Sequence, residues 1–224
     1  MSLNLINGLF YSSHKLEGID NERLINETIR IRKEGNTYLS NTSRPHHTEV
    51  DVSHTFYEDV PLPKEIEQQF KTSALNAIDG VFGKGSFELH EVWGHYIPPL
   101  EQTMVHDHAG ANNIQLSCVY YPHVPENAGN LFLICEANGQ RHTHELECKA
   151  GYLYLFSSDL LHYTPRNGSG VDRVSVSANW QASPQFKDLI EHDVEYLNPY
   201  WYFVGKNDII LHKANGVSID LKGN

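Results

Sequence analysis

Cysteine is scarce in this sequence, and its three occurrences are too widely spaced to form a paired motif. Cys118, Cys135 and Cys148 are odd in number and include no C-x-x-C, which argues against both a disulfide framework and a zinc knuckle. Free thiols of this kind are usual in a reducing compartment, so we expect a cytoplasmic protein.

Basic residues and long apolar runs are also few. Lys and Arg number 17 against 28 Asp and Glu, and the formal charge of -11 argues against a protein that tracks nucleic-acid phosphates. No apolar run approaches the ~20 residues that span a bilayer. The N-terminus has neither the basic region nor the long apolar region of a signal peptide. We therefore expect neither a nucleic-acid nor a membrane partner.

The composition and length fit a single domain with one core. The 224 residues are 40% hydrophobic and 20% charged, which is ordinary for a globular protein. The pattern divides the chain into a helical lead-in (1–85), a strand-rich core (86–180) and a C-terminal extension of helix and strand (181–224). No shift in composition marks a domain boundary inside 1–224.

Two helices are predicted in the lead-in. The first runs from Asp20, a capping residue, to Glu34 and is ended by Gly35. The second has Pro63 in its first turn and an apolar stripe that stops at Gly80. The polar stretch between them, 37–59, is expected to run extended over the surface.

From Phe87 onward the apolar residues alternate, and β-branched and aromatic residues become frequent. Turn sequences separate six strands, and a third helix is predicted to begin at Ser183, followed by a hairpin in the tail. The pattern predicts a mainly β fold with a closed or sandwiched antiparallel sheet and helices against one face. The six predicted strands are FELHEVWGHYI, IQLSCVYY, NLFLICEA, RHTHELEC, GYLYLF and DRVSVSANW.

The first candidate site is the H-x-H formed by His106 and His108. Residues two apart in a strand point to the same side, so the two imidazoles converge while Asp107 faces away. Two imidazoles on one face make half of a metal site. A pair of exposed strand histidines explains the same pattern equally well.

The second candidate site is His162, followed eleven residues later by Arg173. Arg173 and Ser175 share one face of the last strand, as do Ser177 and Asn179. A guanidinium inside a barrel is costly to bury unless an anion meets it, and a carboxylate ligand would supply that anion. The alternatives are an internal Asp or Glu partner, or an arginine that faces solvent.

Together the two stretches fit one chemistry. Three side chains on one face of an octahedral iron leave positions open for a chelating 2-oxo acid and for dioxygen. The arginine one strand away can then bind the far carboxylate of that acid. The full order of H-x-H, then histidine, then arginine is more specific for this chemistry than the H-x-H pair or the His162 and Arg173 pair alone.

These motifs resemble those of the 2-oxoglutarate/Fe(II)-dependent oxygenase superfamily, above all its prolyl-hydroxylase-like bacterial and phage-borne members. The resemblance spans about residues 9–180 and is carried by HDHAGANNIQLSCVYY, GYLYLFSSDLLHYTPRN and RVSVSANW. It implies that the fold is a double-stranded β-helix (jelly-roll) barrel. It also implies that the protein occurs in the cytoplasm of a bacterium or of a phage-infected cell. It implies Fe(II) and 2-oxoglutarate as cofactors, and dioxygen and an organic substrate, either a protein side chain or a small molecule, as reaction partners.

The resemblance also implies roles for single residues. The iron ligands would be His106, His108 and His162, and the contacts to the C5 carboxylate of 2-oxoglutarate would be Arg173 and Ser175. Two tyrosines match positions that hydrogen-bond the co-substrate in the prolyl-hydroxylase-like members, although ordinary core tyrosines fit equally well. They are Tyr96 and Tyr121.

This sequence departs from the family where most members have H-x-D or H-x-E. Histidine at position 108 leaves the full metal charge unneutralised, and Asp107 replaces it as a ligand only if the strand is locally twisted. A cupin-like barrel or a non-catalytic, phage-associated metal-binding barrel are the competing hypotheses. The sequence pattern does not identify the substrate. We expect the substrate to contact residues 36–56, including Arg44–His47, and the chain from Pro184 onward. The aromatic run Tyr200–Phe203 packs on the barrel or on a second copy in a homo-oligomer.

Overall fold

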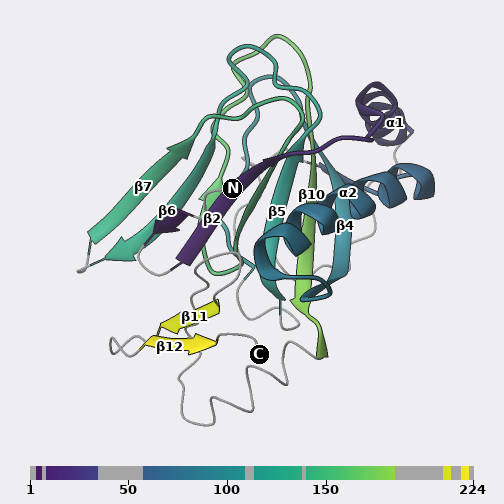
Figure 1. Ribbon diagram of the computed structural model, residues 1–224. Helices are drawn as coiled ribbons and strands as arrows, with labels where there is room; N and C mark the ends of the chain where they lie inside the picture. The colour runs from purple at the N-terminus through teal and green to yellow at the C-terminus, as the bar shows by residue number, and fades with distance from the viewer. Residues whose placement is uncertain are drawn as a thin grey trace.

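The computed structural model describes residues 4–6, 9–34, 58–108, 114–137, 140–184, 209–212 and 218–221. Two antiparallel sheets enclose an apolar interior, and two helices lie on the outer side of the larger sheet (Figure 1). The architecture is therefore mainly β with flanking helices, as the alternating sequence pattern predicted. It is the two-sheet arrangement of a jelly-roll barrel.

The larger sheet has seven strands, all paired antiparallel. In spatial order they are β1 (Asn4–Ile6), β2 (Leu9–Lys15), β8 (Tyr152–Ser157), β5 (Ile114–Tyr121), β10 (Arg173–Ala182), β4 (Phe87–Ile97) and β3 (Glu58–Val60). The smaller sheet has the order β7 (Gln140–Leu146), β6 (Leu131–Ala137) and β9 (Leu161–Tyr163). β11 (Ile209–His212) and β12 (Ser218–Leu221) form a separate hairpin.

The strands β1, β2 and β3 lie in the part of the sequence that was predicted to be a helical lead-in. The barrel therefore extends beyond 86–180. The β2 strand escaped prediction because its buried face carries two polar residues after Phe10. Ser12 and His14 are buried there, with the Ser12 hydroxyl 2.8 Å from the His14 Nε2 atom. Since these side chains satisfy each other, a polar strand face can be buried without the apolar alternation that marks a strand.

The helices begin where the sequence predicted, and one ends later. The α1 helix (Asn21–Lys33) is capped by Asp20, whose carboxylate accepts from the Arg23 N–H at 3.0 Å. The α2 helix (Lys64–Phe82) continues through Gly80, so the predicted stop there is wrong. The last turn is held because Phe82 packs edge-on against Phe10 and Phe87, at centroid distances of 5.2 and 5.1 Å.

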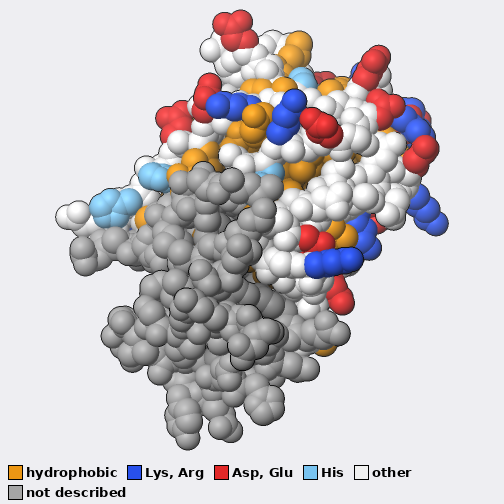
Figure 2. Space-filling model, in the orientation of Figure 1, with side chains coloured by type: hydrophobic (Ala, Val, Ile, Leu, Met, Phe, Trp, Pro, Cys, Tyr) orange, Lys and Arg blue, Asp and Glu red, His pale blue; other side chains and the backbone are white. Residues whose placement is uncertain are grey.

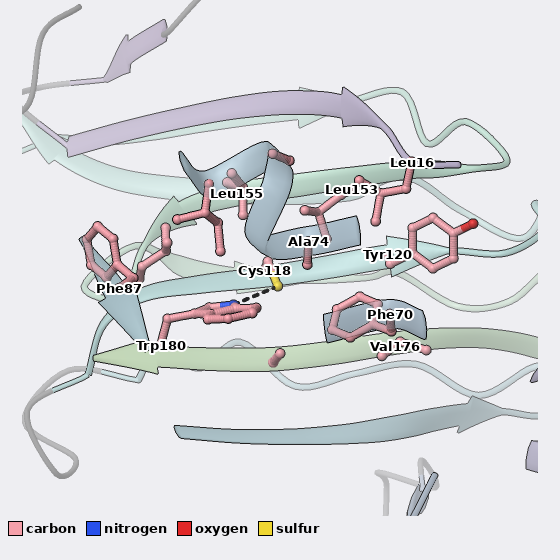
Figure 3. Close-up of a cluster of buried hydrophobic side chains, with 14 of the residues drawn as sticks. Leu16, Phe70, Ala74, Phe87, Cys118, Tyr120, Leu153, Leu155, Val176 and Trp180 are labelled. Atoms are coloured by element: carbon pink, nitrogen blue, oxygen red, sulfur yellow. Dashed lines mark hydrogen bonds between the residues drawn. The ribbon is translucent and has the colours of Figure 1, made fainter. Parts of the chain in front are cut away.

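The main apolar core lies between these helices and the outer side of the larger sheet. Phe70 and Ala74 of α2 meet side chains from three strands, among them Tyr120, Val176 and Trp180 (Figure 3). The indole N–H of Trp180 donates to the Cys118 sulfur at 3.3 Å. Burial raises the pKa of the Cys118 thiol to about 12, so this cysteine is an apolar packing residue rather than a nucleophile.

The second core lies between the two sheets and is lined by the opposite faces of the same strands. Tyr121, Tyr154 and Phe156 of the larger sheet pack against Leu131 and Leu133 of the smaller one. The far end of the smaller sheet leaves this core, and the histidines of its edge strand β7 are exposed at the left of Figure 2. Edge strands with polar side chains resist pairing with other chains.

Several predictions concern residues outside the described ranges. They are the helix from Ser183, most of the extended stretch 37–59, the Arg44–His47 cluster and the Tyr200–Phe203 run. Within the described ranges, no helix is both long and apolar enough to span a bilayer.

Candidate metal centre

Three histidine rings converge between the two sheets. His106 and His162 lie opposite each other in an antiparallel bridge, with backbone N···O distances of 3.1 and 2.8 Å, and the His108 N–H donates to the Ser158 carbonyl at 2.9 Å. The ring centroids are 4.2 to 5.2 Å apart. One ring nitrogen from each histidine lies within 4.8 Å of the others, so these residues can share one metal ion.

The backbone fixes the protonation of two of these rings. The Nδ1 atom of His106 lies 2.9 Å from the Met104 carbonyl oxygen, and the Nδ1 atom of His162 lies 2.9 Å from the Leu160 carbonyl oxygen. A carbonyl only accepts, so Nδ1 carries the hydrogen in both rings and Nε2 keeps its lone pair. This second bond of a ligating histidine is a usual feature of metal sites.

Electrostatics keep His162 in the neutral form that a metal requires. Burial lowers the pKa of His162 well below its usual value, and the neighbouring His106 and His108 lower it further. A neutral imidazole can coordinate a metal without first releasing a proton, so the ring is ready to bind at neutral pH.

Arg173 is buried on the inner face of β10, only 2% exposed. Its Nη1 donates to the Ala128 carbonyl at 3.2 Å, and its guanidinium lies 4.9 Å from the Tyr121 ring centroid. Within the described ranges it forms no ion pair with a carboxylate. Ser175, two residues along the same face, is also buried. The structure therefore brings a buried cation and a hydroxyl to the interior that holds the histidines.

Tyr121 faces the same interior and is 1% exposed. Burial raises the pKa of Tyr121 well above its usual value, Cys148 raises it further, and the nearby Arg173 opposes the shift. The phenol is therefore a neutral hydrogen-bonding group beside the guanidinium. Of the two tyrosines considered from the sequence, this one lies with Arg173.

Tyr96 lies on the other face of the larger sheet. It pairs across the strands with Val174, packs in the helix-covered core and has the Arg32 guanidinium 5.3 Å from its ring centroid. The structure thus does not bring Tyr96 to the histidines. The interior position belongs to its neighbour His95, since adjacent strand residues point to opposite faces. His95 pairs with Ser175 across the strands, and its Nδ1 atom lies 2.8 Å from the Asp59 carboxylate.

Other interior residues of β4 were missed by sequence reasoning. The Trp93 ring lies 6.1 Å from the His108 ring, and Glu91 accepts from the amide of Asn179 at 2.7 Å. The alternation of β4 contained the signal, because residues 91, 93 and 95 share the parity of the inner face. Asp107 is exposed and is not among the grouped donor atoms, whereas His108 is.

Comparisons with known proteins support the fold. No protein-family model matches the sequence, and no curated protein matches it. Among solved structures, a prolyl-4-hydroxylase from Pseudomonas putida is 19% identical, with 77% of this chain and 92% of that chain covered and a TM-score of 0.52. A Trichoplax adhaerens prolyl hydroxylase, solved with a hypoxia-inducible-factor peptide, is 12% identical, with 81% and 86% covered and a TM-score of 0.58.

A third similar structure is the epimerase SnoN of nogalamycin biosynthesis, solved with Fe³⁺ and α-ketoglutarate. It is 13% identical, with 78% of this chain and 79% of that chain covered and a TM-score of 0.52. At these identities the likeness concerns the fold alone. This chain therefore has the fold of the 2-oxoglutarate/Fe(II) oxygenases, as its motifs predicted, and in that fold it places a group of three histidines.

Proposed function

We propose that this protein is a non-haem Fe(II)- and 2-oxoglutarate-dependent dioxygenase that hydroxylates an organic substrate. The observation that carries the proposal is that the three histidines and Arg173 lie together between the two sheets. Three histidines offer nitrogen donors within 4.8 Å of one another, and Arg173 is buried without an acidic partner in the described chain.

The histidines are the groups that would hold the iron. His106 and His162 present Nε2 because their Nδ1 hydrogens are bonded to backbone carbonyls. Bound Fe(II) and 2-oxoglutarate supply the oxidising chemistry, in which dioxygen hydroxylates the substrate while the co-substrate is converted to succinate and CO2. The donor set contains no carboxylate, so the anionic co-substrate would meet the full dipositive charge of the metal.

Arg173 is the group that would bind the distal carboxylate of 2-oxoglutarate. A buried guanidinium requires an anion, and a planar carboxylate matches its paired N–H groups. Ser175 and Tyr121 would add neutral hydrogen bonds on the same face, since both are buried beside it. The ligand would thus supply the negative charge that Arg173 lacks among the described residues.

The substrate class we propose first is a protein side chain. Two of the similar solved structures, which are prolyl hydroxylases, support this class. A small molecule is the second class, since the third is an epimerase solved with nogalamycin RO.

The test is an anaerobic titration of metal-free protein with Fe(II) and then with 2-oxoglutarate. A weak visible charge-transfer band should grow with the second ligand and saturate at one equivalent. His162→Ala should abolish the band by removing the metal. Arg173→Met should shift its midpoint to higher 2-oxoglutarate concentration while leaving Fe(II) binding unchanged.

A protein that binds Fe(II) tightly but shows no band would contradict the oxygenase proposal. That outcome favours the cupin-like or non-catalytic metal-binding barrel, because both keep the histidines and neither uses Arg173. If the band does form, succinate formation on admission of air, with a peptide library as substrate, would decide between the two substrate classes.

A further inference from the structure

His108 differs from the other two candidate ligands in the group that its Nδ1 atom meets. In His106 and His162 this atom faces a backbone carbonyl. In His108 it lies 3.3 Å from the amide nitrogen of Asn179. An amide NH2 donates and does not accept, so in this contact the His108 Nδ1 atom is the acceptor, and an Nδ1 hydrogen would need a partner other than Asn179.

The orientation of Asn179 is fixed by its two other contacts. Its amide nitrogen donates to the Glu91 carboxylate at 2.7 Å, and its carbonyl oxygen accepts from the Ser117 hydroxyl at 2.8 Å. Turning the amide around would place its oxygen against the carboxylate. Two oxygens at hydrogen-bond distance repel each other, so the amide nitrogen stays on the side of Glu91 and His108.

Glu91 is the acceptor in this cluster. Its carboxylate is hydrogen-bonded to the same amide nitrogen that the His108 Nδ1 atom contacts. A carboxylate has two oxygens with about four lone-pair sites, so it can accept from Asn179 and from an imidazole together. Glu91 lies directly opposite Asn179 in the strand pairing, on the inner face, and the register shifts immediately after that pair. Such bulges commonly re-aim side chains beside functional sites.

We propose that Glu91 is a positioning residue for the metal centre, accepting the Nδ1 hydrogen of His108 when Nε2 of that ring binds the metal. The proposal rests on the proposed metal site. The donor set of three histidines contains no carboxylate. In this proposal a carboxylate contacts the metal centre indirectly, through a hydrogen bond to His108. A histidine paired with a carboxylate is a stronger donor to a metal, and its ring is held in one orientation.

The test uses Co(II) alone as the probe and compares the wild type with Glu91→Gln. A glutamine keeps the shape and one oxygen, but it loses the charge and the second acceptor. Co(II) affinity should fall by roughly 10–100-fold, as for other lost partners of a ligating histidine. The matched control is Glu88→Gln on the same strand, where the side chain is exposed. It removes the same charge, and its affinity should stay within about twofold because solvent and salt screen it.

A second readout separates positioning from a general effect on folding. Ring N–H protons of Co(II)-bound histidines have strongly shifted proton resonances, and hydrogen-bonded ones exchange slowly with water. The wild type should show three such slow protons, and Glu91→Gln should lose the one from His108 alone. If the variant does not fold, the wild type still decides, since rapid exchange of the His108 proton contradicts the proposal.

Equal Co(II) affinity and three slow protons in Glu91→Gln would overturn the role of Glu91 and leave the proposed function standing. Conversely, if Co(II) affinity falls as expected but 2-oxoglutarate gives no band with Fe(II), the oxygenase proposal fails and the role of Glu91 remains. Absence of Co(II) binding to the wild type would contradict both.

Discussion

The two faces of β10 show how one strand serves two different environments. Val174, Val176, Ala178 and Trp180 face α2 and belong to the main apolar core, while Arg173, Ser175 and Asn179 face the smaller sheet and are equally buried. The helix side gains stability from excluded water and close packing. The barrel side holds polar groups that cost free energy unless they are matched. Along β10, the apolar packing residues therefore lie on one side of the sheet and the residues of the candidate site lie on the other.

The largest effect should come from the barrel side. His162→Ala removes one of three metal donors, and we expect Co(II) affinity to fall by more than the roughly 10–100-fold typical of a lost outer partner. Isothermal titration would measure this loss. Folding should persist, since a neutral, buried imidazole is replaced by a small apolar side chain. Wild-type metal affinity in the variant would remove His162 from the site.

The matching substitution on the helix side is Phe70→Ala. Phe70 is fully buried in the main core, so the lost burial and the resulting cavity should lower the free energy of unfolding by about 3–5 kcal/mol. Urea unfolding would measure it. The folded fraction should bind Co(II) as the wild type does, because His106, His108 and His162 lie on the other side of the sheet. A large loss of affinity per folded molecule would show that the two faces are coupled.

Arg173→Met should separate binding from stability. It removes a charge-assisted pair worth about 1.5–3 kcal/mol, so 2-oxoglutarate affinity should fall by roughly 10–100-fold. The ligand-free protein should unfold at the same or a higher urea concentration, since an unmatched buried charge is replaced by an apolar side chain. A marked loss of stability in the ligand-free variant would instead indicate a structural role for the guanidinium.

The pH dependence of stability should reflect buried histidines on both faces. Burial lowers the pKa of His14 on the helix side and of His162 on the barrel side, and in both it is the largest cause. The folded pKa lies below the unfolded value of about 6.5, so the stability of the metal-free protein is lost as pH falls through that value. Each histidine contributes at most about 1.4 kcal/mol per pH unit. Urea unfolding at several pH values would test this, and His14→Gln should reduce the slope.

The smallest effects should distinguish the two tyrosines. Tyr121→Phe removes a phenol beside Arg173, and loss of one neutral hydrogen bond, about 0.5–1.5 kcal/mol, should weaken 2-oxoglutarate binding several-fold. Tyr96→Phe changes the opposite face and should leave that affinity unchanged. Parallel titrations of the Fe(II)-loaded variants would measure both. Equal losses of 2-oxoglutarate affinity in the two variants would contradict the conclusion that Tyr96 lies away from the co-substrate site.

Three features of the fold depart from the sequence pattern for physical reasons. Tyr96 was matched to a position that hydrogen-bonds the co-substrate, but a shift of one residue along a strand reverses the face, and it is His95 that lies on the inner face. The β2 strand was hidden because Ser12 and His14 satisfy each other in a buried position. The α2 helix passes Gly80 because Phe82 gains aromatic contacts that outweigh the poor helix propensity of a single glycine.

The candidate site was predictable where periodicity alone decides orientation. His106 and His108 share a face at a spacing of two, as do Arg173 and Ser175, so the sequence by itself predicted these groupings, the mainly β fold and the helix-covered sheet. Pairing between distant strands was decided only by the tertiary structure. It placed His162 against His106, Tyr121 beneath Arg173 and Glu91 beside Asn179, because strand register and the bulge in β4 are set by packing across the whole sheet rather than by local spacing.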